Sequence, residues 1–293
     1  MKIAVMPSAR GGVTSDPHWM VTWARHAERA GFEALVTIEH PLVVSERSSR
    51  YPYSASGRMP LPDDTPIPDP LDLLAFVAGA TTTLGLATGV LVLPAHHPVV
   101  LGKRLATLDV LSGGRLRLCV GLGWMREELE ACGTDFDSRG RRADEMIDAM
   151  RVLWAESGPA GAEFSGEFFT FAGAHSYPKP SRPGGVPVHI GGTSRASMRR
   201  AAARGAGWQP LGIDGEELRG AVSDMRRQVE DAGRDPASFE ITISAVGPKI
   251  TPDTVDEAAD MGVDRLIASM LATDLGEALD ELSALAARLG LSA

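Results

Sequence analysis

The chain has 293 residues, of which 44% are hydrophobic and 23% are charged, and its formal net charge is −9. This composition is typical of a globular protein that can bury one large core. An acidic chain lacks the basic face on which non-specific nucleic-acid binding depends, so nucleic acid is not an expected partner. The two cysteines, Cys119 and Cys132, predict neither a disulfide framework nor a cysteine-rich zinc site.

The start of the chain carries no recognisable targeting signal. Residues 1–12 contain one lysine and too short an apolar run for a secretory signal, and no apolar stretch of about 18 residues follows. We therefore expect a cytoplasmic protein that does not bind membranes.

Runs typical of β-strands alternate with amphipathic helical patterns along the whole chain. The expected strands cover 3–9, 34–40, 85–93, 115–123, 186–192, 207–212, 239–247 and 264–270. Helices are expected near 17–30, 70–82, 98–111, 125–132, 140–156 and 194–204, and after each of the last three strands, the last ending near Leu289. Eight strand–helix units favour a (β/α)₈ TIM barrel over a doubly wound sheet, with residues 1–293 as a single domain.

Two segments interrupt this alternation. Residues 41–69 contain six of the twenty prolines and read as a long ordered loop after the second strand, which in a compact domain is usually functional. Residues 162–185 read as a short hairpin around Ser165–Gly166 and a proline-rich connector before the fifth strand. We expect both insertions on the carboxyl-terminal face of the barrel, where barrel enzymes build their sites.

Gly121-Leu122-Gly123 ends the fourth expected strand and leads into a helix. A dinucleotide-binding motif would need a third glycine where this chain has Arg126, so that interpretation is disfavoured. Two interpretations stay open: a tight turn, or a place where missing Cβ atoms let a ligand approach the backbone.

Glu39 and His40 end the second expected strand, where a barrel places catalytic side chains. An imidazole can donate or accept a proton near neutral pH, although a histidine after a strand is more often a loop or core residue. A second candidate is Gly191-Gly192-Thr193-Ser194, which leads into a helix. Free amides at a helix start can bind a phosphate, and ordinary capping by a hydroxyl is the alternative.

No metal site is expected. His96 and His97 are adjacent and so do not face one point, and no established histidine–carboxylate spacing for a metal occurs.

Residues 69–154, with "TIEH" (37–40) and "VHIGGTSRASMRRAAARGAGW" (188–208), resemble the luciferase-like monooxygenase superfamily. The resemblance is closest to its actinobacterial branch of coenzyme F420-dependent oxidoreductases. It implies a (β/α)₈ barrel with an insertion before the fifth strand, and a homodimer formed through helices near the first three strands.

The resemblance also implies site residues. An acid–histidine pair, here Glu39 and His40, lies beside the reactive ring of the cofactor, with Glu39 fixing the imidazole or bonding the ring. A non-proline cis peptide, here Gly89–Val90, presses against the middle of that ring, and the family binds the cofactor phosphate at the glycine pair before the helix. The implied cofactor-binding residues are Glu39, His40, Gly89, Val90, Gly121, Gly123, Gly191, Gly192, Thr193 and Ser194.

The chain departs from the family's sugar-phosphate dehydrogenases at one position. They carry a catalytic Glu directly after the strand-four glycine, and this chain has Trp124. Sugar-phosphate chemistry is therefore not expected. The residues expected around the substrate, Val44, Trp124, Met125 and Trp208, predict an apolar pocket for a small hydrophobic organic molecule such as a carbonyl or enone.

Three functions stay open on this resemblance. The first is hydride transfer with F420. The second is an FMNH2-dependent monooxygenase that uses O2 and a separate flavin reductase. The third is a barrel that binds flavin without turnover, and the retained Glu39–His40 pair argues against it, because storage needs no proton donor.

Overall fold

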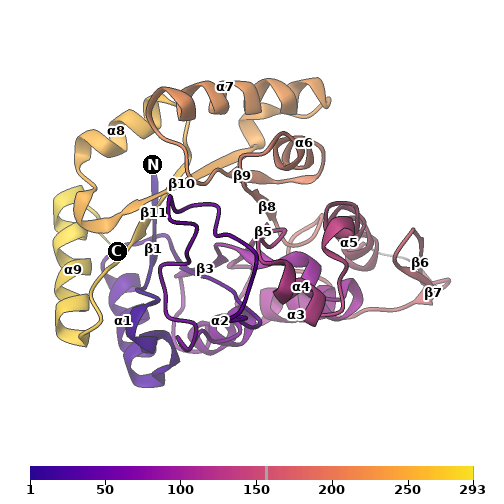
Figure 1. The fold of residues 1–293 in the computed structure, drawn as a ribbon, viewed down its shortest axis with the longest axis horizontal. Helices are drawn as coiled ribbons and strands as arrows, with labels where there is room; N and C mark the ends of the chain where they lie inside the picture. The colour runs from indigo at the N-terminus through magenta and orange to yellow at the C-terminus, as the bar shows by residue number, and fades with distance from the viewer. Residues whose placement is uncertain (156–157, 293) are drawn as a thin grey trace.

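The computed structural model describes residues 1–155 and 158–292 as a closed parallel barrel wrapped in helices (Figure 1). The nine strands of its sheet run in the order β3-β2-β1-β11-β10-β9-β8-β5-β4, and a β3–β5 pairing closes the ring. Because the short β3 and β4 lie one after the other beside β5, they form one position of an eight-position barrel. The strands are β1 (Lys2–Met6), β2 (Ala34–Thr37), β3 (Gly85–Thr88), β4 (Leu91–Val92), β5 (Leu116–Gly121), β8 (Val188–Gly191), β9 (Gly207–Gln209), β10 (Glu240–Val246) and β11 (Arg265–Ser269). The (β/α)₈ prediction is confirmed.

The helices begin close to their expected residues because local capping signals set their starts. Asp16, Asp69 and Asp274 each accept a hydrogen bond from a backbone amide of the helix that follows, and proline occupies the first turn after Asp16 and Asp69. The helices are α1 (Pro17–Arg29), α2 (Pro70–Ala78), α3 (Pro98–Leu111), α4 (Arg126–Ala131), α5 (Arg139–Trp154), α6 (Arg195–Arg204), α7 (Gly215–Asp231), α8 (Pro252–Asp260) and α9 (Leu275–Leu289). The expected end of α5 at residue 156 lies outside the described residues.

None of the helices formed by the described residues combines the length and the apolar character that crossing a bilayer requires.

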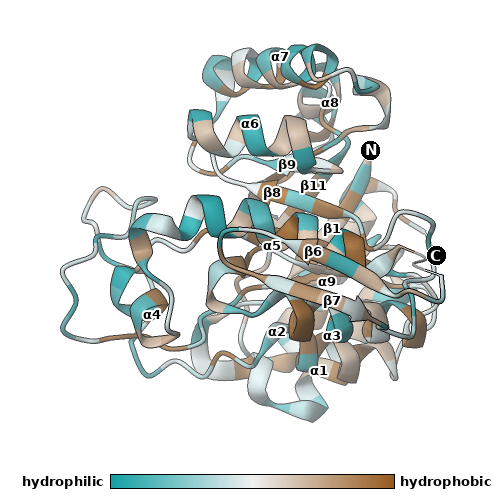
Figure 2. Ribbon diagram, turned by 90° about the vertical axis from the view of Figure 1, so that its right-hand side faces the viewer, coloured by the Kyte–Doolittle hydropathy of each residue, from teal (hydrophilic) through white to brown (hydrophobic). Residues whose placement is uncertain are grey.

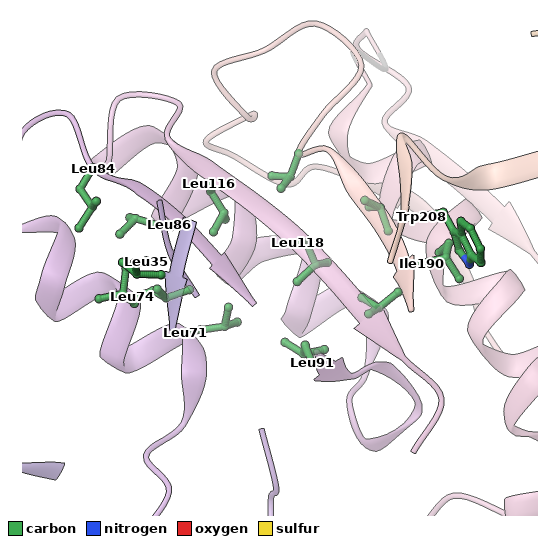
Figure 3. Close-up of a cluster of buried hydrophobic side chains, with 14 of the residues drawn as sticks. Leu35, Leu71, Leu74, Leu84, Leu86, Leu91, Leu116, Leu118, Ile190 and Trp208 are labelled. Atoms are coloured by element: carbon green, nitrogen blue, oxygen red, sulfur yellow. The ribbon is translucent and has the colours of Figure 1, made fainter. Parts of the chain in front are cut away.

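The main core lies between the strands and the helices. Alternate strand residues such as Leu35, Leu86 and Leu118 point outward and pack with Leu71 and Leu74 of α2 (Figure 3). Inward positions of β1, β2, β3 and β11 form a separate cluster inside the barrel, made of Ala4, Ala34, Val36, Ala87 and Ile267. The two clusters follow from the alternation of strand side chains between the two faces of the sheet.

The two insertions lie in different places. The 41–69 loop connects β2 to α2 and therefore lies on the carboxyl-terminal face, as expected. The hairpin of β6 (Ala162–Ser165) and β7 (Thr170–Ala174) instead lies on the side of the molecule, outside α5 (Figures 1 and 2). Its placement on the carboxyl-terminal face was wrong, because a connection from a helix to the next strand enters the barrel at the opposite end. The Glu145 carboxylate of α5 accepts hydrogen bonds from the hairpin amides of residues 167–169.

Candidate functional site

The carboxyl-terminal ends of β2, β4, β5 and β8 bring the expected site residues together. Glu39 and His40 follow β2, Val90 lies between β3 and β4, Gly121 ends β5, and Gly191 ends β8. In Figure 2, α4 lies at this end of the molecule. Segments that are up to about 150 residues apart in the chain thus meet at one barrel mouth, as a parallel barrel requires.

The Val90 side chain lies in a space that two glycines leave open. The Gly89–Val90 peptide bond is cis in the structure, as the resemblance implied. A Cβ added at Gly121 would lie 2.7 Å from one Val90 methyl group, and a Cβ added at Gly191 would lie 2.9 Å from the other. Gly121 and Gly191 therefore make room for the Val90 side chain. This corrects the expectation of direct approach, because a flat ligand at this mouth would meet Val90 before it met the glycine backbone.

Gly123 has a separate reason to be glycine. Its φ of +76° is one that other residues rarely adopt, and it turns the chain from β5 towards α4. The structure thus supports the tight turn at Gly123, and at Gly121 the space that the missing Cβ leaves is filled by Val90 and not by a ligand.

The Glu39 carboxylate is buried and points away from His40. Its Oε2 accepts a hydrogen bond of 2.5 Å from the Val92 amide, and its Oε1 lies 2.9 Å from His96 Nε2. The prediction that Glu39 fixes the His40 imidazole is therefore corrected. Since His96 pairs with Glu39, it belongs to the site for a reason unrelated to metal binding.

The carboxylate that does contact His40 comes from α4. Glu128 Oε1 lies 3.0 Å from His40 Nδ1, and the Glu128 side chain is fully buried. Its other oxygen, Oε2, has no hydrogen-bond partner among the described residues. Sequence reasoning missed Glu128 because it is one of three glutamates in a short acidic helix, and no local pattern separates it from Glu127 and Glu130.

The 41–69 loop reaches across to α4. Glu127 accepts hydrogen bonds from the amide and hydroxyl of Ser48 and from the Ser49 amide. The hydrogen bonds from Ser49 and Ser48 lower the pKa of Glu127 to about 2. Arg47 of the loop donates to the Val44 carbonyl oxygen and to Asp63. The expected pocket residue Val44 is half-buried in this braced segment.

Aromatic rings link the loop to His40. Trp124 contacts the His40 ring edge-on with centroids 6.1 Å apart, and Tyr51 contacts Trp124 in the same manner at 5.3 Å. Tyr53 continues the series at 5.4 Å from Tyr51. Trp124 therefore lies between the imidazole and the loop, where the sequence placed it as a substrate-pocket residue, and it is partly exposed.

Two other residues that were expected to line the pocket are buried in the core and do not reach the barrel mouth. Met125 is fully buried, and so is Trp208, whose indole Nε1 donates a hydrogen bond of 2.7 Å to the Gly192 carbonyl oxygen. Figure 3 shows Trp208 next to Ile190 in the core. The expectation that Met125 and Trp208 line the pocket is corrected, because the alternation of strand residues turns Trp208 outward and the first turn of α4 turns Met125 inward.

The Gly191–Ser194 segment forms the start of α6. Ser194 caps the helix by accepting from the Ser197 amide at 3.1 Å, and Thr193 Oγ1 lies 3.5 Å from the Leu211 carbonyl oxygen. The Gly192 amide already donates to the Gln209 carbonyl oxygen at 3.0 Å. The expectation that Gly192 donates to a phosphate is therefore corrected. The Ser197 amide is thus engaged by the cap, and the Arg195 and Ala196 amides before it have no intrahelical acceptor and lie at the positive end of the helix dipole.

In the part of the chain that the structure describes, no group of three or more His, Cys, Asp or Glu side chains is arranged to hold a metal ion. His97 serves instead as the amino-terminal cap of α3.

Comparison with known proteins agrees with this architecture. The family model described as luciferase-like monooxygenase matches residues 1–289. An uncharacterized protein of Mycobacterium tuberculosis is 32% identical over 253 residues, which is 86% of this chain and 85% of that protein. An FMNH2-dependent dimethylsulfone monooxygenase of Pseudomonas putida is 31% identical over 266 residues, 86% of this chain and 66% of that protein.

A solved structure shows the same fold at lower identity. An F420-dependent secondary alcohol dehydrogenase, in complex with an F420–acetone adduct, has a TM-score of 0.76 and 16% identity, covering 98% of both chains. The match of the family model over almost the whole chain and the 32% identical relative lead to one conclusion: the chain belongs to the luciferase-like monooxygenase family.

Proposed function

We propose that this chain is an F420-dependent oxidoreductase acting on a small hydrophobic organic substrate. The observation that carries the proposal is the His40–Glu128 pair, which lies at the same barrel mouth as the Val90 side chain. An imidazole braced by a carboxylate can hold or release the proton that accompanies hydride transfer.

The residues present fit a cofactor with a flat ring and a phosphate. The Val90 side chain, held over Gly121 and Gly191, offers an apolar contact to the middle of a ring. The Arg195 and Ala196 amides at the start of α6 offer donors to a phosphate at a helix amino terminus, with Thr193 and Ser194 beside them. The deazaflavin, when bound, supplies the ring carbon that gives or takes the hydride.

The chain's own residues then have separate tasks. His40 Nε2 is the nitrogen that exchanges a proton with the substrate, since Nδ1 is engaged by Glu128. Trp124 and the 41–69 loop cover the mouth and exclude water, which strengthens electrostatic contacts inside. With Trp124 where a sugar-phosphate enzyme carries a Glu, the proposed substrate is an apolar carbonyl or enone.

A second candidate is an FMNH2-dependent monooxygenase that takes reduced flavin from a separate reductase. It is favoured by the similarity to the dimethylsulfone monooxygenase of Pseudomonas putida, which extends over 86% of this chain. The same Val90 contact and α6 amides would hold FMN.

Parallel fluorescence titration of the apoprotein with F420 and with FMN separates the two candidates. We expect F420 to bind at least about tenfold more tightly, a difference of about 1.4 kcal/mol. Turnover of bound F420 is then screened with aldehydes, ketones and enones. Tight binding of FMN alone would replace the first candidate with the second, and binding of neither would contradict both.

We also propose a homodimer in which α2 and α3 meet the partner. Phe76, Val100 and Leu111 on these helices are large apolar residues that are 46%, 60% and 74% exposed. Light scattering tests this: a monomer at micromolar concentration would contradict it.

A further inference from the structure

We propose that Glu128 is a positioning residue that holds His40 in the tautomer with the proton on Nδ1, so that Nε2 is the atom that exchanges a proton with the substrate. The catalytic consequence rests on the proposed function. The tautomer itself is a property of the protein without cofactor and can be measured independently.

The contact between the two side chains allows one direction of hydrogen bonding when Glu128 is ionised. A carboxylate oxygen only accepts, so at 3.0 Å from Glu128 Oε1 the His40 Nδ1 must carry the hydrogen. Among the described residues His40 Nε2 has no hydrogen-bond partner, and the His40 side chain keeps 12% of its surface exposed. Nε2 is therefore the nitrogen left for a ligand at the mouth.

Glu39 cannot take over this task. Both of its oxygens are engaged, one by the Val92 amide and the other by His96. The barrel mouth thus contains two separate carboxylate–histidine pairs, and the one that includes His40 depends on Glu128.

The environment of Glu128 differs from that of the glutamates that only brace the fold. Glu145 and Glu28 each accept hydrogen bonds from three consecutive backbone amides. Glu128 contacts one donor, His40, and leaves a buried oxygen without a partner among the described residues. Glu127 also keeps a buried oxygen without a partner among the described residues, but its other oxygen is held by Ser48 and Ser49. The one side-chain hydrogen bond of Glu128 within the described residues goes to His40, so the position of this carboxylate acts on His40.

The first turn of α4 is anchored from outside by the 41–69 loop. The Arg126 amide donates to Ser49 Oγ at 2.9 Å, and Glu127 accepts three hydrogen bonds from Ser48 and Ser49. Glu128, the next residue, points inward to His40. Glu127 and Glu128 are therefore adjacent acids whose partners lie on different sides of α4, the loop for Glu127 and His40 for Glu128. Glu127 is for this reason a matched control.

The test is ¹⁵N NMR of the histidine side chains in the apoprotein at about pH 9, where imidazoles are neutral. His40→Gln identifies the His40 signals by their loss. In the parent protein we expect a protonated Nδ1 and an unprotonated Nε2. A parent His40 that carries its proton on Nε2 overturns the proposal without any further variant.

Two Glu128 variants and one control complete the test. Glu128→Met fills the same space without an acceptor and should shift His40 towards the tautomer with the proton on Nε2. Glu128→Gln keeps an acceptor and should retain part of the original tautomer. Glu127→Gln should leave the His40 signals unchanged, and an unchanged tautomer in a folded Glu128→Met contradicts the proposal.

Activity provides a second readout on the enzyme loaded with whichever cofactor binds. Glu128→Met should lower kcat by up to the roughly 10²-fold at the lower end of general acid–base catalysis, while KM stays within about threefold. Equal losses of kcat in Glu128→Met and Glu127→Gln would mean that the Glu128 carboxylate has no specific effect on His40 and that both variants act by displacing α4. If the parent shows no turnover at all, the proposed function fails while the tautomer measurement still stands.

Discussion

The two ends of the barrel use charged residues in opposite ways. At the amino-terminal end, Arg265 lies 2.9 Å from oxygens of both Glu33 and Glu240, and Arg117 lies 3.1 Å from Glu33. The buried His189 lies 3.4 Å from Glu240. At the carboxyl-terminal end, Glu128 keeps an oxygen without a partner among the described residues.

The charged groups at the amino-terminal end of the barrel pair with one another. Burial alone would raise the pKa of Glu33, but Arg117 and Arg265 outweigh it and lower that pKa. Arg265 is 1% exposed and bonds to both carboxylates and to Thr242. This barrel therefore closes one end with ion pairs that need no ligand and leaves hydrogen-bonding capacity at the other.

The largest effect is expected from Arg265→Ala. It removes the buried guanidinium from the half-buried Glu33 and Glu240, which keep Arg117 and Lys2 as partners. We therefore expect a loss of about 3 kcal/mol, the lower end of the roughly 3–5 kcal/mol that breaking a fully buried pair costs. Urea unfolding measures the free energy of unfolding. Arg141→Ala removes an exposed ion pair with Glu167 and serves as control, with little expected change. Equal stability of the two variants would mean that the network does not hold this end of the barrel.

Acid should destabilise the protein in part through His189. Burial, with Arg117 nearby, lowers the pKa of His189 to about 3. Because this pKa is lower in the folded protein, His189 of the unfolded chain binds its proton at a higher pH than His189 of the folded chain. The contribution of the neutral His189 to the free energy of unfolding is therefore fully present above about pH 6.5. It is lost as the pH falls towards 3, and the loss amounts to up to a few kcal/mol.

Thermal melting between pH 6.5 and 4.5 tests this, in the window above the ordinary carboxylate range. His189→Gln should flatten the pH dependence of the melting temperature relative to the parent. The same slope in both proteins would show that other groups cause the acid sensitivity.

His40→Ala tests the carboxyl-terminal end. Turnover should fall by roughly 10²-fold or more, while cofactor affinity stays within a few-fold, because the imidazole acts on a proton and not on the cofactor's phosphate. Steady-state kinetics and a binding titration measure the two quantities. His26→Ala on α1, far from the mouth, is the control. Lost binding with normal turnover at saturation would make His40 a cofactor ligand instead.

A smaller effect is expected from Gly121→Ala. The new methyl group would lie 2.7 Å from Val90 and push its side chain out of place. Overpacking of this kind costs about 1–3 kcal/mol, and we expect cofactor affinity to fall about tenfold. Val90→Ala in the same chain should relieve the clash, so a double-mutant cycle is the measurement. Additive effects of the two substitutions would contradict direct contact.

Much of the fold could be predicted from local signals. The alternation of strands and helices predicted eight barrel positions, and the amphipathic pattern placed helix starts such as Pro17 and Pro70 within a few residues. The ends of strands also pointed to His40, Gly121 and Gly191. These signals act over a few residues of chain, so they are visible without a structure.

Other features depend on how the barrel closes. Glu128 meets His40 across 88 residues of chain, Val90 fills the space beside two glycines from other strands, and Trp208 turns into the core. The sequence by itself determined the barrel, the helix starts and the strand ends that carry the candidate site, because hydrophobic periodicity is local. Only the tertiary structure decided which carboxylate pairs with His40 and what covers Gly121, because strand register and helix packing bring those atoms together.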